Sequence, residues 1–247
     1  MRPMKQLERL HKVKRKQTYP NRRPKDAASL LIFDLDVPAN PRVLLGRRHP
    51  SQEFIPDKLV FPGGRVSQSD SRVCVDDELS ADDEAHILYD MKGRASKSRA
   101  RAIAMAAIRE TFEETGILIG ENCGDAPKTR SGEWSDYFAA SVKPSLSRMT
   151  FIARAITPPR RSRRYDTRFF LTTKSHIVKT IGEGDGEFTE THWMPVKDVE
   201  NFDLHPMSRS ILDDAVALIN PKTGAIKTGQ IPYYFMRNGV FQRQLIG

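Results

Sequence analysis

Three glutamates at helical spacing are the residues in this sequence best suited to chemistry. Glu110, Glu113 and Glu114 are three and four positions apart, so on a helix their carboxylates share an arc of ~100°. Carboxylates this close repel one another, and no lysine lies between residues 110 and 117 to relieve the repulsion. Mg²⁺ or Mn²⁺ would relieve it, because these ions take carboxylate oxygens, water and substrate phosphates as ligands. We therefore interpret the three glutamates as metal ligands; the alternative is a solvated acidic helix face without a function.

The surrounding pattern predicts the elements that must position these glutamates. Residues 99–115 are the most regular predicted helix, rich in alanine and ending at Gly116, which suits the left-handed position after a helix. A mixture of strands and helices with few strand–helix alternations indicates an α+β or layered α/β fold. Other predicted helices are at about 81–91, within 134–148, and at 206–220. Predicted strands are at 28–35, 42–47, 59–61, 151–156, 167–172 and 191–194, and Asn238-Gly239 predicts a hairpin.

The stretch from Arg109 to Ile117 resembles the second half of the Nudix box, the signature of the Nudix hydrolases. The family pattern is G-x5-E-x7-R-E-U-x-E-E-x-G-U, where U is a bulky apolar residue. Phe61-Pro62-Gly63-Gly64 resembles the start of this box. Asp70 stands where the family has glutamate, and 38 residues separate Asp70 from Arg109 where the family has seven. Whether Asp70 substitutes for the usual glutamate stays open at this point.

The resemblance implies a fold and a reaction. The fold is the Nudix α/β/α sandwich, an α/β (α+β) architecture with a mixed sheet. Residues 26–247 would form this domain, with a helical insertion at about 71–99 inside the box and a C-terminal extension at about 200–247. The reaction is metal-dependent hydrolysis of the diphosphate linkage in a nucleoside-diphosphate-linked compound, with Mg²⁺ or Mn²⁺ as the cofactor.

The resemblance also implies roles for residues in and around the helix. Glu110, Glu113 and Glu114 would coordinate the metal. Arg109 would hold one of these glutamates in place through charge-assisted hydrogen bonds rather than contact the substrate.

Residues outside the helix complete the predicted site. Gly63 and Gly64 would let their loop pack over the helix, because a side chain there would collide; the alternative is an ordinary tight turn. A further glutamate from a loop outside the box often serves as base or extra ligand in this family. Glu187 and Glu190 are the candidates, and for each the alternative is a solvated loop residue.

Other segments are similar to the Nudix branch that contains the peroxisomal CoA diphosphatase, which also has an insertion inside the box. This similarity favours CoA or an acyl-CoA as substrate. The alternatives are ADP-ribose, dinucleotides or RNA 5′ ends, or a non-catalytic module that senses a nucleotide. The segments are Arg47-Arg48 with Phe54-Ile55-Pro56, residues 156–159 and 164–170, Gly186-Glu187 and Trp193.

Four arginines are candidates for contact with substrate phosphates. Arg47 and Arg48 end a predicted strand that leads toward the two glycines, and Arg164 and Arg168 belong to an arginine-rich stretch. A guanidinium group offers paired donors that match phosphate oxygens. The alternative is a solvated loop in which Arg164 or Arg168 bonds to Asp166.

The basic charge is concentrated in residues 1–25. This arm holds ten lysines and arginines and one glutamate, and ten minus one equals the net charge of +9. Apolar residues at Met4, Leu7, Leu10 and Val13 suit a short amphipathic helix. We expect the arm to be separable from the fold, and either partly disordered or docked as a helix. Its deletion would then leave the melting temperature nearly unchanged, and nucleic acid is an alternative partner for it.

The remaining composition indicates the cellular compartment in which the protein acts. Cys74 and Cys123 have neither a metal-ligand spacing nor a disulfide framework, and no apolar run reaches ~20 residues. No apolar stretch follows the basic residues of the arm, so a secretory signal is not expected. We predict a cytoplasmic protein without a membrane partner that acts on a small nucleotide-type molecule. The family resemblance adds a homodimer as a candidate assembly.

Overall fold

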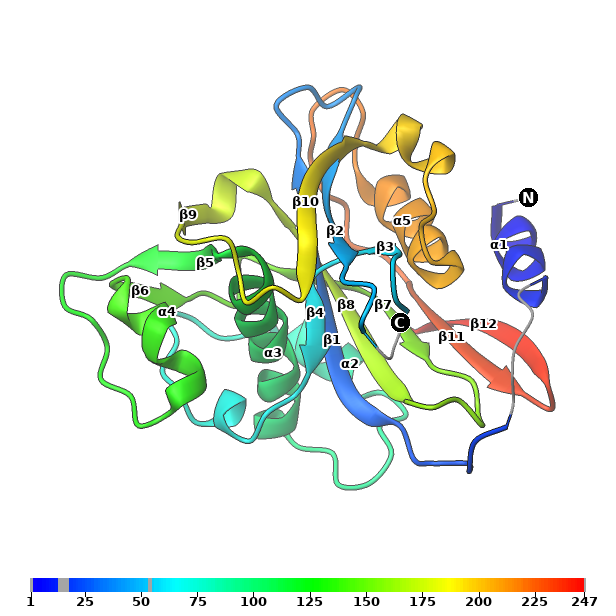
Figure 1. The fold of residues 1–247 in the computed structure, drawn as a ribbon, viewed down its shortest axis with the longest axis horizontal. Helices are drawn as coiled ribbons and strands as arrows, with labels where there is room; N and C mark the ends of the chain where they lie inside the picture. The colour runs from blue at the N-terminus through cyan, green and yellow to red at the C-terminus, as the bar shows by residue number, and fades with distance from the viewer. Residues whose placement is uncertain (1, 13–17, 53–54, 247) are drawn as a thin grey trace.

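A mixed β-sheet forms the centre of the structure (Figure 1). The computed structural model describes residues 2–12, 18–52 and 55–246. Its main strands are β1 (Lys25–Asp34), β2 (Arg42–Arg48), β3 (Leu59–Val60), β4 (Gly63–Arg65), β7 (Thr150–Ile156), β8 (Tyr165–Thr173), β10 (Phe188–Pro195), β11 (Ile231–Arg237) and β12 (Val240–Ile246). They join in the order β10-β2-β1-β8-β7-β11-β12, while β3 pairs with β2 and β4 with β1. The β1–β8 and β7–β11 pairs are parallel and the others antiparallel, so the sheet is mixed as predicted.

Helices cover both faces of this sheet. Helix α3 (Lys97–Thr115) lies on one face and α5 (Pro206–Leu218) on the other. Strand β1 separates two hydrophobic clusters because successive side chains point to opposite faces: Leu30 and Ile32 belong to the α3 side, and Leu31 and Phe33 to the α5 side. The predicted sandwich is therefore confirmed.

Helix α3 has clear signals at both ends. The Ser96 hydroxyl accepts a hydrogen bond from the Arg99 N–H at 3.2 Å and caps the first turn. Gly116 follows the last turn with φ of +71°, the left-handed conformation predicted for it. The residues between them bury an almost continuous run of alanine, isoleucine and methionine side chains.

The residues between Asp70 and Arg109 include the helix expected in the insertion. Helix α2 (Ala81–Leu88) begins where the Ser80 hydroxyl accepts from the Asp83 N–H at 3.1 Å. Its C-terminal end is tied to the main sheet, since Arg154 Nη1 donates to Tyr89 O at 2.6 Å. The 3₁₀ turn η1 (Ser69–Ser71) lies at the start of the insertion and carries Asp70.

The helix predicted within residues 134–148 is present but short. The turn η2 (Gly132–Trp134) leads into α4 (Ser135–Ala139), and the chain then reverses at Ser141, which has φ of +57°. Trp134, Tyr137 and Phe138 pack their rings together in the core, so one helical turn is enough to bury them. Strand β6 (Val142–Pro144) follows.

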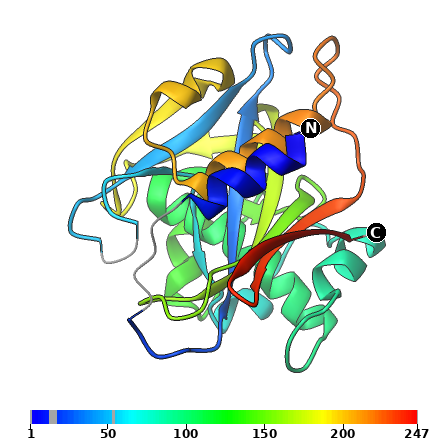
Figure 2. The ribbon, with the colours of Figure 1, turned by 90° about the vertical axis from the view of Figure 1, so that its right-hand side faces the viewer.

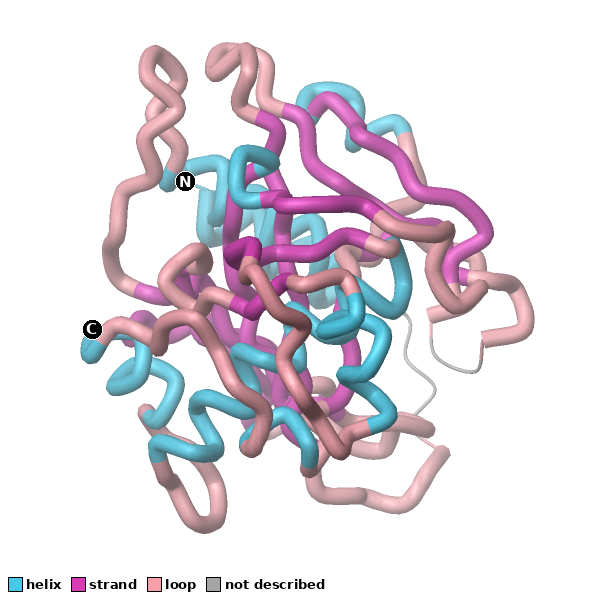
Figure 3. Tube along the Cα trace, turned by 90° about the vertical axis from the view of Figure 1, so that its left-hand side faces the viewer, coloured by secondary structure: helices cyan, strands magenta, loops and turns pink. Residues whose placement is uncertain are grey.

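A second, smaller sheet joins this region to the end of α3. It has the order β6-β5-β9, where β5 is Ile117–Asn122 and β9 is Ile177–Thr180. The small sheet and α4 lie on the α3 side of the main sheet (Figure 3). The remaining short elements are η3 (Lys174–His176) and η4 (Val196–Asn201). Across the described ranges, no helix combines the length and apolar composition needed to cross a bilayer.

Part of the basic arm is a docked helix. Helix α1 (Arg2–His11) lies beside α5 (Figure 2). Gln6 is buried, and its amide donates to Ser210 O and Asp214 Oδ1, each at 3.1 Å. The Tyr234 hydroxyl lies 2.5 Å from Asp214 Oδ2 and 3.1 Å from Gln6 Oε1. The arm thus shares a buried polar network with α5 and β11. Residues 13–17 of the arm lie outside the described part of the chain.

Deleting residues 1–12 is expected to destabilise the protein, contrary to the expectation for a separable arm. The deletion exposes the surface that covers Leu10 and leaves Tyr234 and Asp214 without Gln6. Together these losses cost ~2–4 kcal/mol, a fall in Tm of roughly 4–16 °C. Thermal unfolding followed by circular dichroism measures the change. An unchanged Tm would show that α1 does not stabilise the fold.

Candidate active site

Glu114 is the most deeply buried of the three predicted ligands. Its side chain is 1% exposed, and Oε2 accepts a hydrogen bond from the Gly63 N–H at 2.8 Å. Oε1 is also buried but has no hydrogen-bond partner in the described structure. Burial, together with the nearby Glu187 carboxylate, raises the pKa of Glu114 well above its usual range. The charged carboxylate is therefore costly here unless a cation compensates it.

Glu110 lies one turn earlier, against the glycine loop. Burial raises its pKa to about 7, although the Arg109 guanidinium favours the charged form. A Cβ atom on Gly64 would lie 2.1 Å from Glu110 Oε2, and one on Gly63 would lie 2.3 Å from Ala28 O. Gly63 also has φ of +150°. A side chain at Gly63 would therefore collide with the backbone of β1, whereas one at Gly64 would displace the Glu110 carboxylate on α3.

Arg109 supports the helix face from within the protein. Its guanidinium donates to Asp70 Oδ1 at 2.9 Å and Oδ2 at 3.2 Å, and it lies 2.9 Å from Glu110 Oε1 and 2.7 Å from Glu113 Oε2. Asp70 is fully buried and also accepts from Trp134 Nε1 at 3.1 Å. Asp70 thus holds Arg109, and Arg109 in turn holds two of the three glutamates.

Glu187 reaches the same place from a distant loop. The loop is tied to the end of α3, because the Ile181 N–H donates to Gly116 O at 2.9 Å and the Asp185 N–H to Glu113 O at 2.7 Å. The Glu187 carboxylate pairs with Arg48 Nη2, and Arg48 Nη1 lies 4.0 Å from Glu114 Oε1. Arg48 therefore sits between two carboxylates that repel each other.

Arg47 and Glu190 come together elsewhere. They are register partners on β2 and β10, and Arg47 Nε donates to Glu190 Oε1 at 2.6 Å. The Arg47 side chain is partly buried and that of Glu190 is exposed, and neither lines the cavity that Arg48 and Glu187 reach. Neighbouring residues on a strand point to opposite sides, which separates Arg47 from Arg48. This placement does not support the predictions that Arg47 binds substrate and that Glu190 acts in catalysis.

Arg164 and Arg168 are also engaged elsewhere. Arg168 is fully buried and pairs with Asp26 and Asp166 at 3.1 Å each, so it cannot reach a substrate. Arg164 donates to Thr157 O at 3.1 Å and to Asn21 Oδ1 at 2.9 Å. The substrate-binding prediction is therefore wrong for Arg168, and the structure binds Arg164 to the segment before β1.

Arg161 and Arg163, two other arginines of that stretch, line the cavity instead. The cavity has a volume of about 360 Å³ and lies between the sheet and the start of α5. Glu110, Glu187 and Arg48 lie along its wall. The sequence alone offered no signal to separate Arg161 and Arg163 from Arg164, because all three occur in one basic stretch.

The donor chemistry of this site fits a divalent cation. Glu110, Glu114 and Glu187 repel one another, and the buried Oε1 of Glu114 offers an unused oxygen ligand. Among the residues that the structure describes, however, no three acidic, histidine or cysteine side chains already surround one point as a metal centre. Arg109 and Arg48 now pair with Glu110 and Glu187. Each guanidinium contacts Oε1 of its partner, so the second oxygen of each carboxylate would be the one to contact a cation.

Comparisons with known proteins bear on the fold. No protein-family model matches the sequence, and no curated protein matches it. A solved Nudix hydrolase from Alicyclobacillus acidocaldarius is 22% identical, with a TM-score of 0.62 over 84% of this chain and 98% of that chain. The Nudix domain of Shewanella oneidensis NrtR, complexed with ADP ribose, is 11% identical, with a TM-score of 0.46 over 84% and 94% of the two chains. The first similarity establishes that this chain has the Nudix hydrolase fold.

Replacing Gly64 with alanine is expected to lower kcat/KM for a cleaved diphosphate by at least ~10-fold, equivalent to ~1.4 kcal/mol. The new Cβ would occupy the position of the Glu110 carboxylate and displace it from the site. The matched control is Gly229→Ala, since a Cβ there meets nothing within 4 Å. Equal losses in the two variants would contradict a role for the close contact with Glu110.

Proposed function

We propose that the protein is a divalent-metal-dependent hydrolase that cleaves the diphosphate linkage of a nucleoside-diphosphate-linked compound. The observation that carries the proposal is the convergence of Glu110, Glu114 and Glu187 from two chain segments, with Glu110 and Glu187 lining one cavity. The buried Oε1 of Glu114, which has no hydrogen-bond partner in the described structure, supports a cation there. The fold shared with a Nudix hydrolase supports the same reaction class.

Glu110 and Glu114 are the proposed metal ligands on α3, and Glu113 is the third predicted one. A divalent cation bound there polarises a phosphoryl oxygen and lowers the pKa of a bound water. Arg109 keeps the carboxylates of Glu110 and Glu113 on the correct face of the helix. The Gly63 N–H fixes one oxygen of Glu114 and leaves the other toward the site.

Glu187 is the favoured base of the two candidates. Its carboxylate lines the cavity next to Glu110 and Glu114, whereas Glu190 lies outside it. A carboxylate oxygen of Glu187 would take a proton from the attacking water. Arg48 orients this carboxylate and balances part of the negative charge of the cluster.

CoA or an acyl-CoA is the favoured substrate. CoA carries a 3′-phosphate besides its diphosphate, and Arg161 and Arg163 in the cavity wall provide cationic groups for the additional charge. Cleavage of CoA would yield 3′,5′-ADP and phosphopantetheine. ADP-ribose, dinucleotides and RNA 5′ ends are the comparison substrates.

Turnover of a nucleotide panel tests the proposal. The panel contains CoA, an acyl-CoA, ADP-ribose, a dinucleoside polyphosphate and 5′-capped RNA, each with Mg²⁺ or Mn²⁺, and the products are separated by chromatography. We expect metal-dependent cleavage at the diphosphate, fastest for CoA or acyl-CoA. If CoA is cleaved no faster than the other compounds, CoA is not the preferred substrate. Saturable binding of a nucleotide without turnover would instead indicate a sensor.

A further inference from the structure

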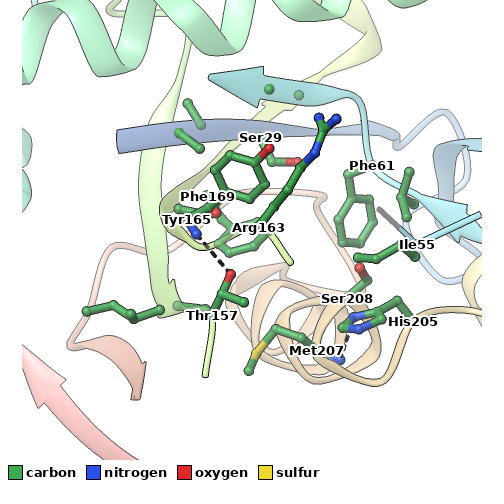
Figure 4. Close-up of a pocket in the computed structure, with 18 of the residues that line it drawn as sticks. Ser29, Ile55, Phe61, Thr157, Arg163, Tyr165, Phe169, His205, Met207 and Ser208 are labelled. Atoms are coloured by element: carbon green, nitrogen blue, oxygen red, sulfur yellow. Dashed lines mark hydrogen bonds between the residues drawn. The ribbon is translucent and has the colours of Figure 1, made fainter. Parts of the chain in front are cut away.

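The cavity extends beyond the part that diphosphate cleavage requires. Its carboxylate end is formed by Glu110 and Glu187, which are the acidic residues among the described residues that line it. Much of the remaining wall is apolar and includes Phe61, Phe169 and Met207. Figure 4 shows these side chains around one space between the sheet and α5. The reaction itself gives no reason for an apolar wall of this extent.

Elements distant in the sequence complete the apolar wall. Leu10 of α1 and Phe241 of β12 both line the cavity, and each is almost fully buried. The Phe241 N–H donates to His11 Nε2 at 3.1 Å, which joins the end of α1 to the start of β12. The basic arm therefore contributes a residue to the same cavity as Glu110.

Helix α1 is held firmly enough to act as a wall. Besides the Gln6 contacts, Arg9 Nη1 pairs with Asp213 Oδ2 at 3.0 Å. Arg243 of β12 donates to the Tyr234 hydroxyl and to Asp214 Oδ1, each at 3.1 Å. The polar network thus connects α1, which carries Leu10, with α5 and the β11–β12 hairpin.

Cationic side chains border the apolar part. Arg163 lines the cavity, and Figure 4 shows its side chain among the rings of Phe61 and Phe169. Arg161 and His205, at the start of α5, both line the cavity. Burial lowers the pKa of the His205 imidazole, and the nearby charge of Arg161 lowers it further. Apolar walls beside guanidinium groups suit a ligand that has an apolar group attached to a phosphate.

We propose that the end of the cavity walled by α1 and β12 is a specificity subsite for an apolar group attached to the diphosphate. Substrates with a largely apolar second half, and a phosphate toward Arg161 and Arg163, would then be preferred over those with a polar second half such as ADP-ribose. Leu10 makes the N-terminal helix part of substrate selection. The reaction assigned to these substrates rests on the proposed function, but binding of the apolar group does not.

Binding of octyl phosphate to the metal-free full chain tests the subsite separately from catalysis. Isothermal titration calorimetry with octyl phosphate, below its micelle concentration, is compared with inorganic phosphate. We expect octyl phosphate to bind at least 10²-fold more tightly, because the chain leaves water for the apolar wall. Equal affinities for the two ligands would overturn the proposal.

Two substitutions locate the octyl chain. Leu10→Trp fills the space at the α1 wall, and Met207→Ala removes apolar surface from α5; each is expected to weaken octyl phosphate binding at least tenfold. The control is Leu7→Ala, since Leu7 packs on the core from the same helix but does not line the cavity. Circular dichroism confirms that each variant is folded. The same small loss in all three variants would overturn the assignment.

Turnover then links the subsite to selectivity. The ratio of kcat/KM for the P²-octyl ester of ADP to that for ADP-ribose should fall at least tenfold in Leu10→Trp and stay constant in Leu7→Ala. A ratio that Leu10→Trp does not change would overturn the role in selection. If neither compound is cleaved while Leu10→Trp still weakens octyl phosphate binding, the subsite stands and the proposed hydrolysis fails.

Discussion

Replacing Glu114 with glutamine is expected to lower kcat at least 10²-fold while the protein stays folded. Glutamine keeps the size of the side chain and an oxygen that accepts from the Gly63 N–H, but it removes the charge that a cation needs. The loss corresponds to ~2.7 kcal/mol or more of transition-state stabilisation. Steady-state kinetics at saturating Mg²⁺ measure the change.

The same variant should be at least as stable as the wild type without metal. Burial raises the pKa of Glu114, so the charged form is disfavoured in the folded protein at neutral pH, and a neutral side chain removes that cost. Mg²⁺ should raise the Tm of the wild type and raise that of Glu114→Gln much less. Calorimetric scans with and without Mg²⁺ measure both effects.

The control for Glu114 is Glu78→Gln. Glu78 is 60% exposed and pairs with Arg101 on the surface, a type of contact worth about 0–1 kcal/mol. Its replacement should leave kcat nearly unchanged. Equal activities of the two variants would mean that the carboxylates on α3 do not act in catalysis.

Arg109→Met is expected to produce the largest loss of stability, ~3–5 kcal/mol in the free energy of unfolding. The substitution keeps a long side chain but leaves the fully buried Asp70 carboxylate without its cation. Activity should also fall, because Glu110 and Glu113 lose the guanidinium that orients them. Urea unfolding measures the stability.

Two further variants test whether the loss of stability comes from the unpaired Asp70 carboxylate. In the double variant Asp70→Asn, Arg109→Met, the buried charge is gone, so it should be less destabilised than the sum of the single changes. Arg47→Met removes an arginine whose partner, Glu190, is exposed, and should cost at most about 1 kcal/mol. A loss for Arg109→Met as small as that for Arg47→Met would contradict a structural role for the Asp70 pair.

Local patterns predicted the elements that depend on local geometry. The relative positions of Glu110, Glu113 and Glu114 follow from helix periodicity alone, and the helix expected at 99–115 is present as α3. The first strand was predictable in the same way, since a continuous apolar run indicates a strand buried on both faces. The predicted hairpin around Asn238-Gly239 is also confirmed.

Properties that depend on long-range pairing could not be predicted. Glu190 lies beside Arg47 because of the register of β10 against β2, whereas Glu187 precedes β10 and pairs with Arg48. Arg168 is directed into the interior because β8 is central and buried on both faces, and an arginine-rich stretch gives no sign of that. Asp70 meets Arg109 only because the chain returns to α3 after the intervening insertion.

Helix α1 is synthesised long before the surfaces that receive it. Gln6 contacts Asp214, 208 positions later in the chain, and His11 contacts Phe241, 230 positions later. At about 5–20 residues per second on a ribosome, the first of these separations corresponds to ~10–40 s. Throughout that interval the basic segment has no docking surface in its own chain. Completion of the cavity is therefore a late event in biosynthesis, and a chain arrested before β12 would expose the arm and lack one wall of its own cavity.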